Sequence, residues 1–342
     1  MNPTPGSYAG AATRVVPLDA SIDLRSVLGA LVRGAGDPTL RVDAGAAIRA
    51  SMTPDGPGAL ELRVATAAGE APEVRAWAWG PGAERLLDGV PALLGLDDDD
   101  AGFEPGHHPR IAELARRRGR IRLGRTGAVW EALLPAILEQ KITGTEAWRN
   151  YRRLVRAHGQ PGPGPLALCC PPTAAQVAGL PQYALIALGI EPRRATLLRR
   201  IAAEARRFEA FGEAVRGPGQ GGQGASNLAA ALQAHSGIGP WTAAEVTLRA
   251  LGDPDAVSVG DFHLSHVVGF ALAGEPRATD ERMLQLLAPW GGHRARVVKL
   301  LEGAGIGPPR YGPRVAPRDL ARDLTPREPR RGEPWHRGSV RR

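Results

Sequence analysis

The sequence predicts a mostly α protein in which a larger helical domain is preceded by a smaller α+β domain. Between residues 109 and 305, apolar residues recur at spacings of three and four, which is typical of successive amphipathic helices. Before residue 109, short alternating or β-branched runs bounded by turn residues indicate strands. With 342 residues, 43% of them hydrophobic, the chain is long enough to bury two cores.

Composition divides the chain into four parts. Residues 1–11 are rich in Gly, Pro and small side chains, which predicts a disordered start. Residues 12–108 are expected to form the α+β domain and residues 109–305 the helical domain. Residues 306–342 are rich in Pro and Arg with few aromatics, which predicts a basic disordered tail.

Each expected element follows from hydrophobic spacing and from Gly or Pro breaks. In the first domain, strands are predicted at residues 13–18, 46–52, 59–66 and 73–79, and helices at residues 24–32 and 83–94. In the second domain, helices are predicted at residues 111–118, 129–142, 145–158, 173–178, 181–187, 193–211, 225–234, 240–251, 262–273, 280–287 and 293–301.

Charge is unevenly distributed along the chain. Residues 1–108 hold 8 basic and 15 acidic side chains, residues 109–305 hold 25 and 16, and residues 306–342 hold 10 and 4. The net charge of +8 therefore belongs to the middle and the end of the chain. A cationic helical domain next to an acidic one fits a surface that faces nucleic acid.

Several classes of protein are disfavoured by composition. The sequence has no run of about eighteen apolar residues and no basic-then-apolar leader, so we expect no membrane association and a cytoplasmic, nucleoid-associated bacterial protein. Cys169 and Cys170 are the only cysteines, and they are adjacent. They cannot supply the four thiolates of an iron–sulfur cluster, so none is expected.

The stretch Gly237-Ile-Gly-Pro-Trp-Thr-Ala243 lies between two predicted helices. Gly237 and Gly239 can adopt a positive φ without strain, and Pro240 suits the first position of the second helix. Backbone N–H groups at that helix start, together with the hydroxyl of Thr242, would form an anion site. Such a hairpin would hold a DNA phosphate without reading sequence.

Three segments together resemble the helix-hairpin-helix DNA glycosylase superfamily, and specifically the 3-methyladenine DNA glycosylase II family. Residues 237–243 resemble its hairpin, and Gly260-Asp-Phe262 resembles its catalytic aspartate segment. Ala136-Ile-Leu-Glu-Gln-Lys141 resembles the segment that enters the duplex. The resemblance implies a helical glycosylase domain, and the position and length of residues 12–108 are similar to the N-terminal domain of that family.

The resemblance also implies roles for single residues. Asp261 would be the catalytic carboxylate, which stabilises positive charge on the sugar while the N-glycosidic bond breaks. A purely structural role, as the N-cap of the following helix, is compatible with catalysis. The residues implied in DNA binding are Gly237, Gly239, Thr242, Gln140 and Lys141.

Two further sites follow from the resemblance. Trp241 and Phe262 would offer aromatic faces to a base rotated out of the duplex, although Trp241 could equally pack in the core beneath the hairpin. Related proteins hold a monovalent cation through main-chain carbonyls of the hairpin, and the corresponding residues here are Gln233, His235 and Ile238.

Trp241 also bears on the type of reaction. Bifunctional members of the superfamily carry a lysine at this position, which attacks the sugar, so Trp241 indicates a monofunctional enzyme. The family's best-known members have an aromatic residue where this chain has Glu245, and an arginine is common where Gly291-Gly292 follow Trp290. These departures leave the base specificity open.

The predicted function is a monofunctional glycosylase of base-excision repair that removes alkylated purines, such as 3-methyladenine and 7-methylguanine, and leaves an abasic site. Its expected partner is double-stranded DNA with damaged bases, and we expect a monomer. One alternative is a non-catalytic helix-hairpin-helix DNA-binding protein, which would have no use for Asp261. Another is a glycosylase for deaminated or oxidised bases.

Overall fold

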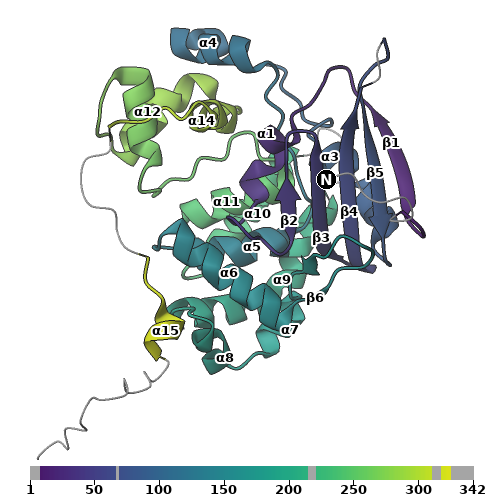
Figure 1. Ribbon diagram of the computed structural model, residues 1–342. Coiled ribbons are helices and arrows are strands. Elements are labelled where there is room, and N and C mark those ends of the chain that lie inside the picture. The colour runs from purple at the N-terminus through teal and green to yellow at the C-terminus, as the bar shows by residue number, and fades with distance from the viewer. Residues whose placement is uncertain (1–7, 67–68, 215–220, 310–316, 325–342) are drawn as a thin grey trace, which may run out of the picture.

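The computed structural model describes residues 8–66, 69–214, 221–309 and 317–324. Its N-terminal part contains a five-stranded antiparallel sheet, drawn in purple and blue at the right of Figure 1. Apolar side chains on one face of the sheet pack against three short helices, α1 (Leu24–Leu28), α2 (Ala83–Asp88) and α3 (Val90–Leu93). The sheet has the order β1 (Ala12–Pro17), β5 (Glu73–Trp79), β4 (Gly56–Ala65), β3 (Ala46–Thr53) and β2 (Leu40–Val42).

The rest of the chain is almost entirely helical, and its helices form two groups with separate cores. The larger group consists of α5 (Val129–Glu139), α6 (Gly144–His158), α7 (Ala174–Gly179), α8 (Gln182–Ala187), α9 (Pro192–Ala214), α10 (Gly221–Gln233) and α11 (Pro240–Leu251). The smaller group consists of α4 (Pro109–Arg118), α12 (Leu264–Ala273), α13 (Asp280–Leu287) and α14 (Arg294–Gly303). Figure 1 shows α4, α12 and α14 together at the top left, above the larger group.

The segment from Gly252 to His263 connects the two helical groups, because it joins the end of α11 to the start of α12. Val257 anchors this segment in the core of the smaller group. Asp261 therefore lies where the two groups meet, which is the position that matters for the candidate site.

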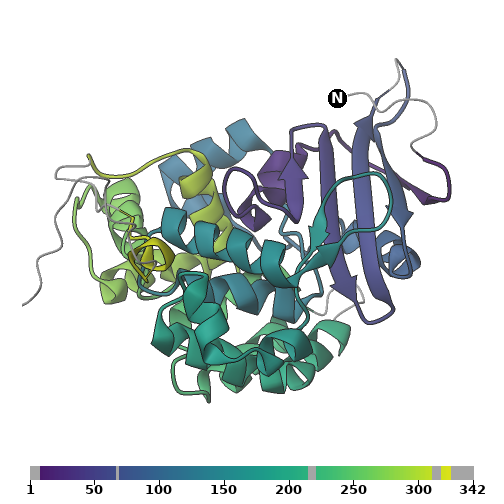
Figure 2. The ribbon, with the colours of Figure 1, turned by 60° about the horizontal axis from the view of Figure 1, so that its bottom comes forward.

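The sheet is fastened to the larger helical group by Glu131 in the first turn of α5. Its carboxylate accepts hydrogen bonds from Arg49 Nη2 at 2.8 Å, Ser51 Oγ at 2.7 Å and the backbone N–H of Met52 at 2.8 Å. Both views place the sheet along one side of the helices (Figures 1 and 2). The N-terminal part is thus held against the helical part by buried polar contacts.

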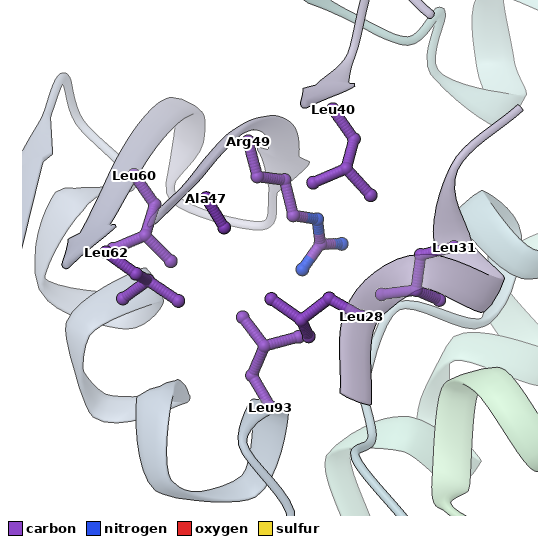
Figure 3. Close-up of a pocket in the computed structure, with 8 residues that line it drawn as sticks. All are labelled: Leu28, Leu31, Leu40, Ala47, Arg49, Leu60, Leu62 and Leu93. Atoms are coloured by element: carbon purple, nitrogen blue, oxygen red, sulfur yellow. The ribbon is translucent and has the colours of Figure 1, made fainter. Parts of the chain in front are cut away.

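A small cavity lies inside the N-terminal part and not at the junction of the helical groups (Figure 3). Seven of its eight lining side chains are aliphatic, and the eighth, Arg49, is paired with Glu131. The seven are Leu28, Leu31, Ala47, Leu40, Leu60, Leu62 and Leu93. Since its one charged group is already occupied, we assign this cavity to imperfect packing between the sheet and its helices.

The observed elements agree with most of the sequence predictions, and several differ. Strand β2 and the short pair β6 (Gln160–Pro161) and β7 (Cys169–Cys170) were not predicted. The predicted helix at residues 83–94 is two helices, separated at Gly89. Of the predicted disordered segments, residues 1–7, 310–316 and 325–342 lie outside the described residues.

Residues 317–324, which were expected to belong to a disordered tail, dock on the helical part. They include α15 (Leu320–Leu324), which packs against α8 (Figure 1). Asp319 accepts hydrogen bonds from Arg153 Nη1 and Nη2 on α6 at 2.7 and 3.0 Å. The hydrogen bond from Arg153 lowers the pKa of Asp319 to about 2. This ion pair explains the difference, because one acidic residue in the basic segment finds a partner on α6.

Within the described ranges, no helix is both long and apolar enough to cross a membrane.

Candidate functional site

The turn between α10 and α11 forms a hairpin with an exposed tip. Gly237 has φ +92°, a value that favours glycine, and the backbone N–H of Ile238 donates to His235 O at 3.0 Å. Ile238 is buried and anchors the turn in the larger core. Gly239 caps α11 in an extended conformation, and Pro240 occupies its first turn, as predicted. The first N–H groups of α11 therefore lie beside two exposed glycines, an arrangement suited to binding an anion.

The end of α5 is attached to this hairpin through Gln140. Its Nε2 donates to Gly237 O at 3.0 Å and to Thr242 Oγ1 at 2.9 Å. Its own carbonyl accepts from Arg194 Nη1 at 2.9 Å. The neighbouring Lys141 is exposed and has φ +56°, a left-handed conformation that is uncommon for a residue other than glycine.

These contacts bear on two predictions. The hydroxyl of Thr242 was expected to bind phosphate, but Thr242 is 2% exposed and its oxygen accepts from Gln140. Gln140 was expected to enter the duplex, but its amide is occupied in holding the hairpin. Lys141 remains as the exposed residue at the tip of this turn. The physical reason is that the two predicted DNA-contact segments are packed against each other.

Asp261 is held by donors from two directions. Its Oδ1 accepts from the backbone N–H groups of His263 at 2.8 Å and Leu264 at 2.9 Å, at the start of α12. Its Oδ2 accepts from Trp241 Nε1 on α11 at 3.2 Å. Gly260, with φ +91°, makes the turn that leads into this arrangement. The carboxylate is half-buried, and hydrogen bonds to both of its oxygens fix its orientation. A fixed orientation suits a group that stabilises a developing positive charge.

The two aromatic residues proposed for the base pocket differ in their surroundings. Trp241 is half-buried and its indole N–H orients Asp261, so it is neither a plain core residue nor a free stacking surface. Phe262 is 82% exposed, and its ring packs edge-on against His263 with centroids 4.9 Å apart. Phe262 therefore lies on the surface and does not form the wall of a pocket.

A second carboxylate, Glu245, lies one turn along α11 from Trp241 and is connected to the Asp261 segment. Ser258 Oγ donates to Glu245 Oε1 at 2.6 Å, and the carbonyl of Ser258 accepts from the backbone N–H of Asp261 at 3.1 Å. Glu245 also pairs with Arg249, whose Nε donates to Ala30 O at 3.2 Å. A short chain of contacts thus connects the N-terminal part with the loop that carries Asp261.

The same N-terminal segment supplies a buried cation. Arg33 is 6% exposed and lies 3.7 Å from Glu139 at the end of α5. Burial lowers the pKa of Arg33, and the nearby Arg249 acts in the same direction. Glu139 in turn accepts from Trp148 Nε1 at 3.2 Å. Charged groups of the N-terminal part, of α5 and of α11 therefore lie close together.

Sequence patterns did not identify Glu302, in the last turn of α14. This side chain is exposed, and partial desolvation by the surrounding protein raises its pKa to about 7. The negative charges of Glu245 and Asp261 act in the same direction, whereas Arg249 and Lys299 oppose them. Lys299 itself has a pKa lowered to about 8, chiefly by burial, and donates to Arg122 O at 2.9 Å.

The main-chain carbonyls proposed for a monovalent cation lie at the end of α10 and in the turn that follows. His235 O accepts from Ile238 N, and the adjacent Gly237 O accepts from Gln140. Carbonyl oxygens are suitable ligands for a hard cation, and each has two lone pairs, so one hydrogen bond does not prevent coordination. Gln233, His235 and Ile238 therefore fit such an ion in kind.

Comparison with solved structures identifies the architecture. A 3-methyladenine DNA glycosylase from Archaeoglobus fulgidus superposes with a TM-score of 0.68 at 18% identity, covering 84% of this chain and 97% of the other. An 8-oxoguanine glycosylase/lyase from Clostridium acetobutylicum gives 0.63 at 13% identity, covering 86% and 99%. The same enzyme with double-stranded DNA gives 0.61 at 13% identity, covering 87% and 99%.

This chain has the fold of the helix-hairpin-helix DNA glycosylases. The resemblance seen in three short motifs is thereby confirmed at the level of the fold, and it extends over most of the chain. No family model and no curated protein sequence matches the chain. Since the two similar enzymes are named for different bases, the fold alone does not assign a substrate.

Proposed function

We propose that this protein is a monofunctional DNA glycosylase that hydrolyses the N-glycosidic bond of alkylated purines and leaves an abasic site. The observation that carries the proposal is the position of Asp261, fixed by α12 and by Trp241 of the hairpin helix. A module that only binds DNA needs the hairpin but not a carboxylate oriented in this way. The proposed partner is double-stranded DNA containing damaged bases, bound by a monomer.

Each residue of the candidate site has a separate role in the proposed reaction. The backbone N–H groups at the start of α11 would bind a phosphate, and exposed Lys141 would approach the gap left by the extruded nucleotide. Asp261 would stabilise positive charge at C1′ while a water attacks that carbon. Because Trp241 offers no amine, the sugar would not become attached to the protein at this position.

A monovalent cation at Gln233, His235 and Ile238 is part of the proposal. Bound there, it would add a positive charge beside the phosphate. The hairpin itself is already closed by the Ile238–His235 and Gln140–Gly237 hydrogen bonds, so we assign the ion to phosphate binding and not to folding of the turn.

Alkylated purines are the proposed substrates for an electrostatic reason. Alkylation at N3 or N7 gives the base a formal positive charge, which weakens its glycosidic bond. The hydrogen bonds that Asp261 accepts come from uncharged N–H groups, so its negative charge favours a cationic ligand over a neutral one. The part of the Trp241 indole that solvent reaches would add a cation–π contribution.

The test is to incubate the purified protein with defined duplexes that carry one lesion each and to identify the released bases by chromatography. We expect release of 3-methyladenine and 7-methylguanine well ahead of hypoxanthine, uracil and 8-oxoguanine at neutral pH. Failure to release any alkylated base, from protein that binds the duplex, would contradict the proposed function. Preferred release of 8-oxoguanine would contradict the substrate class alone.

A further inference from the structure

Residues 317–324 dock on α6 through an aspartate. Asp319 accepts hydrogen bonds from Nη1 and Nη2 of Arg153 at 2.7 and 3.0 Å, and its Oδ2 lies 3.7 Å from Nε of Arg149. Arg149 also donates to a backbone carbonyl of the segment. The segment therefore covers both arginines, although the side chains of Arg153 and Asp319 remain 33% and 24% exposed.

These two arginines belong to a row of four on α6. Arg149, Arg152, Arg153 and Arg156 recur at intervals of three and four residues, so they lie on one side of the helix. Burial lowers the pKa of Arg152, and the positive charges of the other three act in the same direction, so the four guanidinium groups repel one another. Asp319 therefore offsets part of a concentrated positive charge.

The arginine row begins next to the turn that carries Lys141. Helix α6 starts three residues after Lys141, and Arg149 and Arg153 lie about 8 and about 14 Å along the helix from that start. The docked segment also begins at this end of α6, because the backbone N–H of Arg318 donates to Oε2 of Glu146, in the first turn, at 3.2 Å. The covered arginines therefore lie close to the residue that the proposed function directs into the duplex.

The other side of the docking site is attached to the same turn. A Cβ at Gly189, between α8 and α9, would lie 3.2 Å from Nη1 of Arg153 and 3.4 Å from the backbone nitrogen of Ala321. Helix α9 begins three residues after Gly189, and Arg194 in its first turn donates to Gln140 O at 2.9 Å. The segment thus docks between two elements that both meet the turn at Gln140.

We propose that Arg149 and Arg153 bind backbone phosphates of the duplex beside Lys141, and that residues 317–324 cover them in the free protein as a latch that DNA displaces. The inference rests on the proposed function and adds an intramolecular competitor to it. A guanidinium fork binds a carboxylate or a phosphate in the same bidentate manner, so Asp319 occupies the position of a phosphate. A solvent-accessible ion pair is weak, whereas a DNA strand presents an unbroken row of phosphates. Duplex DNA can therefore displace the latch, but it binds less tightly than it would to uncovered arginines.

The experiment measures affinity for an undamaged duplex by fluorescence anisotropy at about 50 mM salt, where phosphate contacts are strong. Asp319→Asn keeps the shape of the side chain and the 10 basic residues of the chain after residue 305, which a truncation would remove. It should tighten binding by about threefold to tenfold, because the arginines are then uncovered in most molecules. In a protein that also carries Arg149→Gln and Arg153→Gln, adding Asp319→Asn should change the affinity less than about twofold, since no arginine is left to uncover.

Asp55→Asn is the matched control, because it makes the same change of charge in the exposed turn between β3 and β4. Its affinity should equal that of the wild type. A second measurement needs no variant. The backbone N–H of Arg318 loses its acceptor when the latch is released, so hydrogen exchange in residues 317–324 of the wild type should be faster in the presence of saturating duplex.

The outcomes separate this inference from the proposed function, which base release measures independently. The latch would be overturned, and the proposed function left standing, by unchanged or weaker binding in Asp319→Asn, by an equal gain in Asp55→Asn or in the protein without the two arginines, or by unchanged or slower exchange in residues 317–324. Failure of the wild type to bind any duplex would overturn both.

Discussion

Replacing Asp261 with Asn tests the candidate site most directly, because it removes a charge while keeping the shape of the side chain. An ionised carboxylate about 4 Å from a developing positive charge contributes about 4 kcal/mol at an effective dielectric constant near 20. That energy corresponds to a rate loss of about 10³-fold. Binding to undamaged duplex should be unchanged, since the phosphate-binding N–H groups belong to α11.

The structure also predicts a specific effect of this substitution on stability. If the introduced asparagine keeps its oxygen toward the N–H groups of His263 and Leu264, its NH₂ group faces Trp241 Nε1, also a donor, across 3.2 Å. Losing that hydrogen bond and opposing two donors costs about 1–2 kcal/mol, or roughly 2–6 °C in Tm. Adding Trp241→Phe removes one of the two donors and should recover part of this loss without restoring the rate.

The assay is single-turnover release of 7-methylguanine, measured together with duplex binding and thermal melting. Asp280→Asn is a matched control, because Asp280 accepts from the backbone N–H of Gly260 at 3.0 Å in the same loop and an amide oxygen can do the same. A wild-type rate in Asp261→Asn, or an equal loss in Asp280→Asn, would show that the loop and not the charge of Asp261 matters.

Four further outcomes are expected. Borohydride should trap no covalent DNA adduct and strands should break only after alkali, since Trp241 stands where an amine would be needed; efficient trapping would contradict hydrolysis. Affinity for undamaged duplex should fall steeply with salt, and deletion of residues 306–342 should weaken it without abolishing excision; a folded but inactive truncation would place the tail in the site. Gln140→Ala should lower the free energy of unfolding by about 1–2 kcal/mol and weaken duplex binding, because the hairpin loses both hydrogen bonds. Unchanged duplex binding would show that these hydrogen bonds contribute to stability and not to binding. Burial raises the pKa of Glu209 from 4.5 to about 7, so the contribution of its protonated form to stability is present below pH 4.5 and is lost as pH rises through about 7. Between about pH 5 and about pH 8, Tm should therefore fall less in Glu209→Gln than in the wild type. Equal changes of Tm with pH in the two proteins would refute this.

The fold could be predicted in large part because local signals and the global structure agree. Helix α11 begins at Pro240 and ends before Gly252, where a proline and a glycine at the expected positions mark both boundaries. The strands β3, β4 and β5 follow alternating runs closely. Strand β2, three residues long, carries too few residues for any period to be visible. Only pairing with β3 makes it a strand.

The site could be predicted only as far as its motifs extend. The sequence indicated Asp261 and the glycines of the hairpin, because those positions depend on local backbone geometry. It did not indicate the contact between Thr242 and Gln140, because that contact joins segments 102 residues apart. A polar side chain next to a phosphate-binding turn has two possible partners, the phosphate and the protein, and sequence alone does not distinguish them.

The contacts of Glu245 show how a carboxylate is accommodated at this position. An isolated glutamate at position 245 would be unfavourable beside a second carboxylate, but here Arg249, one turn later on α11, neutralises it, and the carbonyl of Ala30 holds that arginine in place. The N-terminal part thus supports, through the carbonyl of Ala30, the arginine that neutralises Glu245. With an aromatic residue at position 245, there would be no carboxylate for Arg249 to neutralise, and the carbonyl of Ala30 would not be required to hold that arginine in place. Glu245, Arg249 and the carbonyl of Ala30 therefore form one connected group of contacts, so replacing Glu245 alone with an aromatic residue would leave Arg249 without its carboxylate partner.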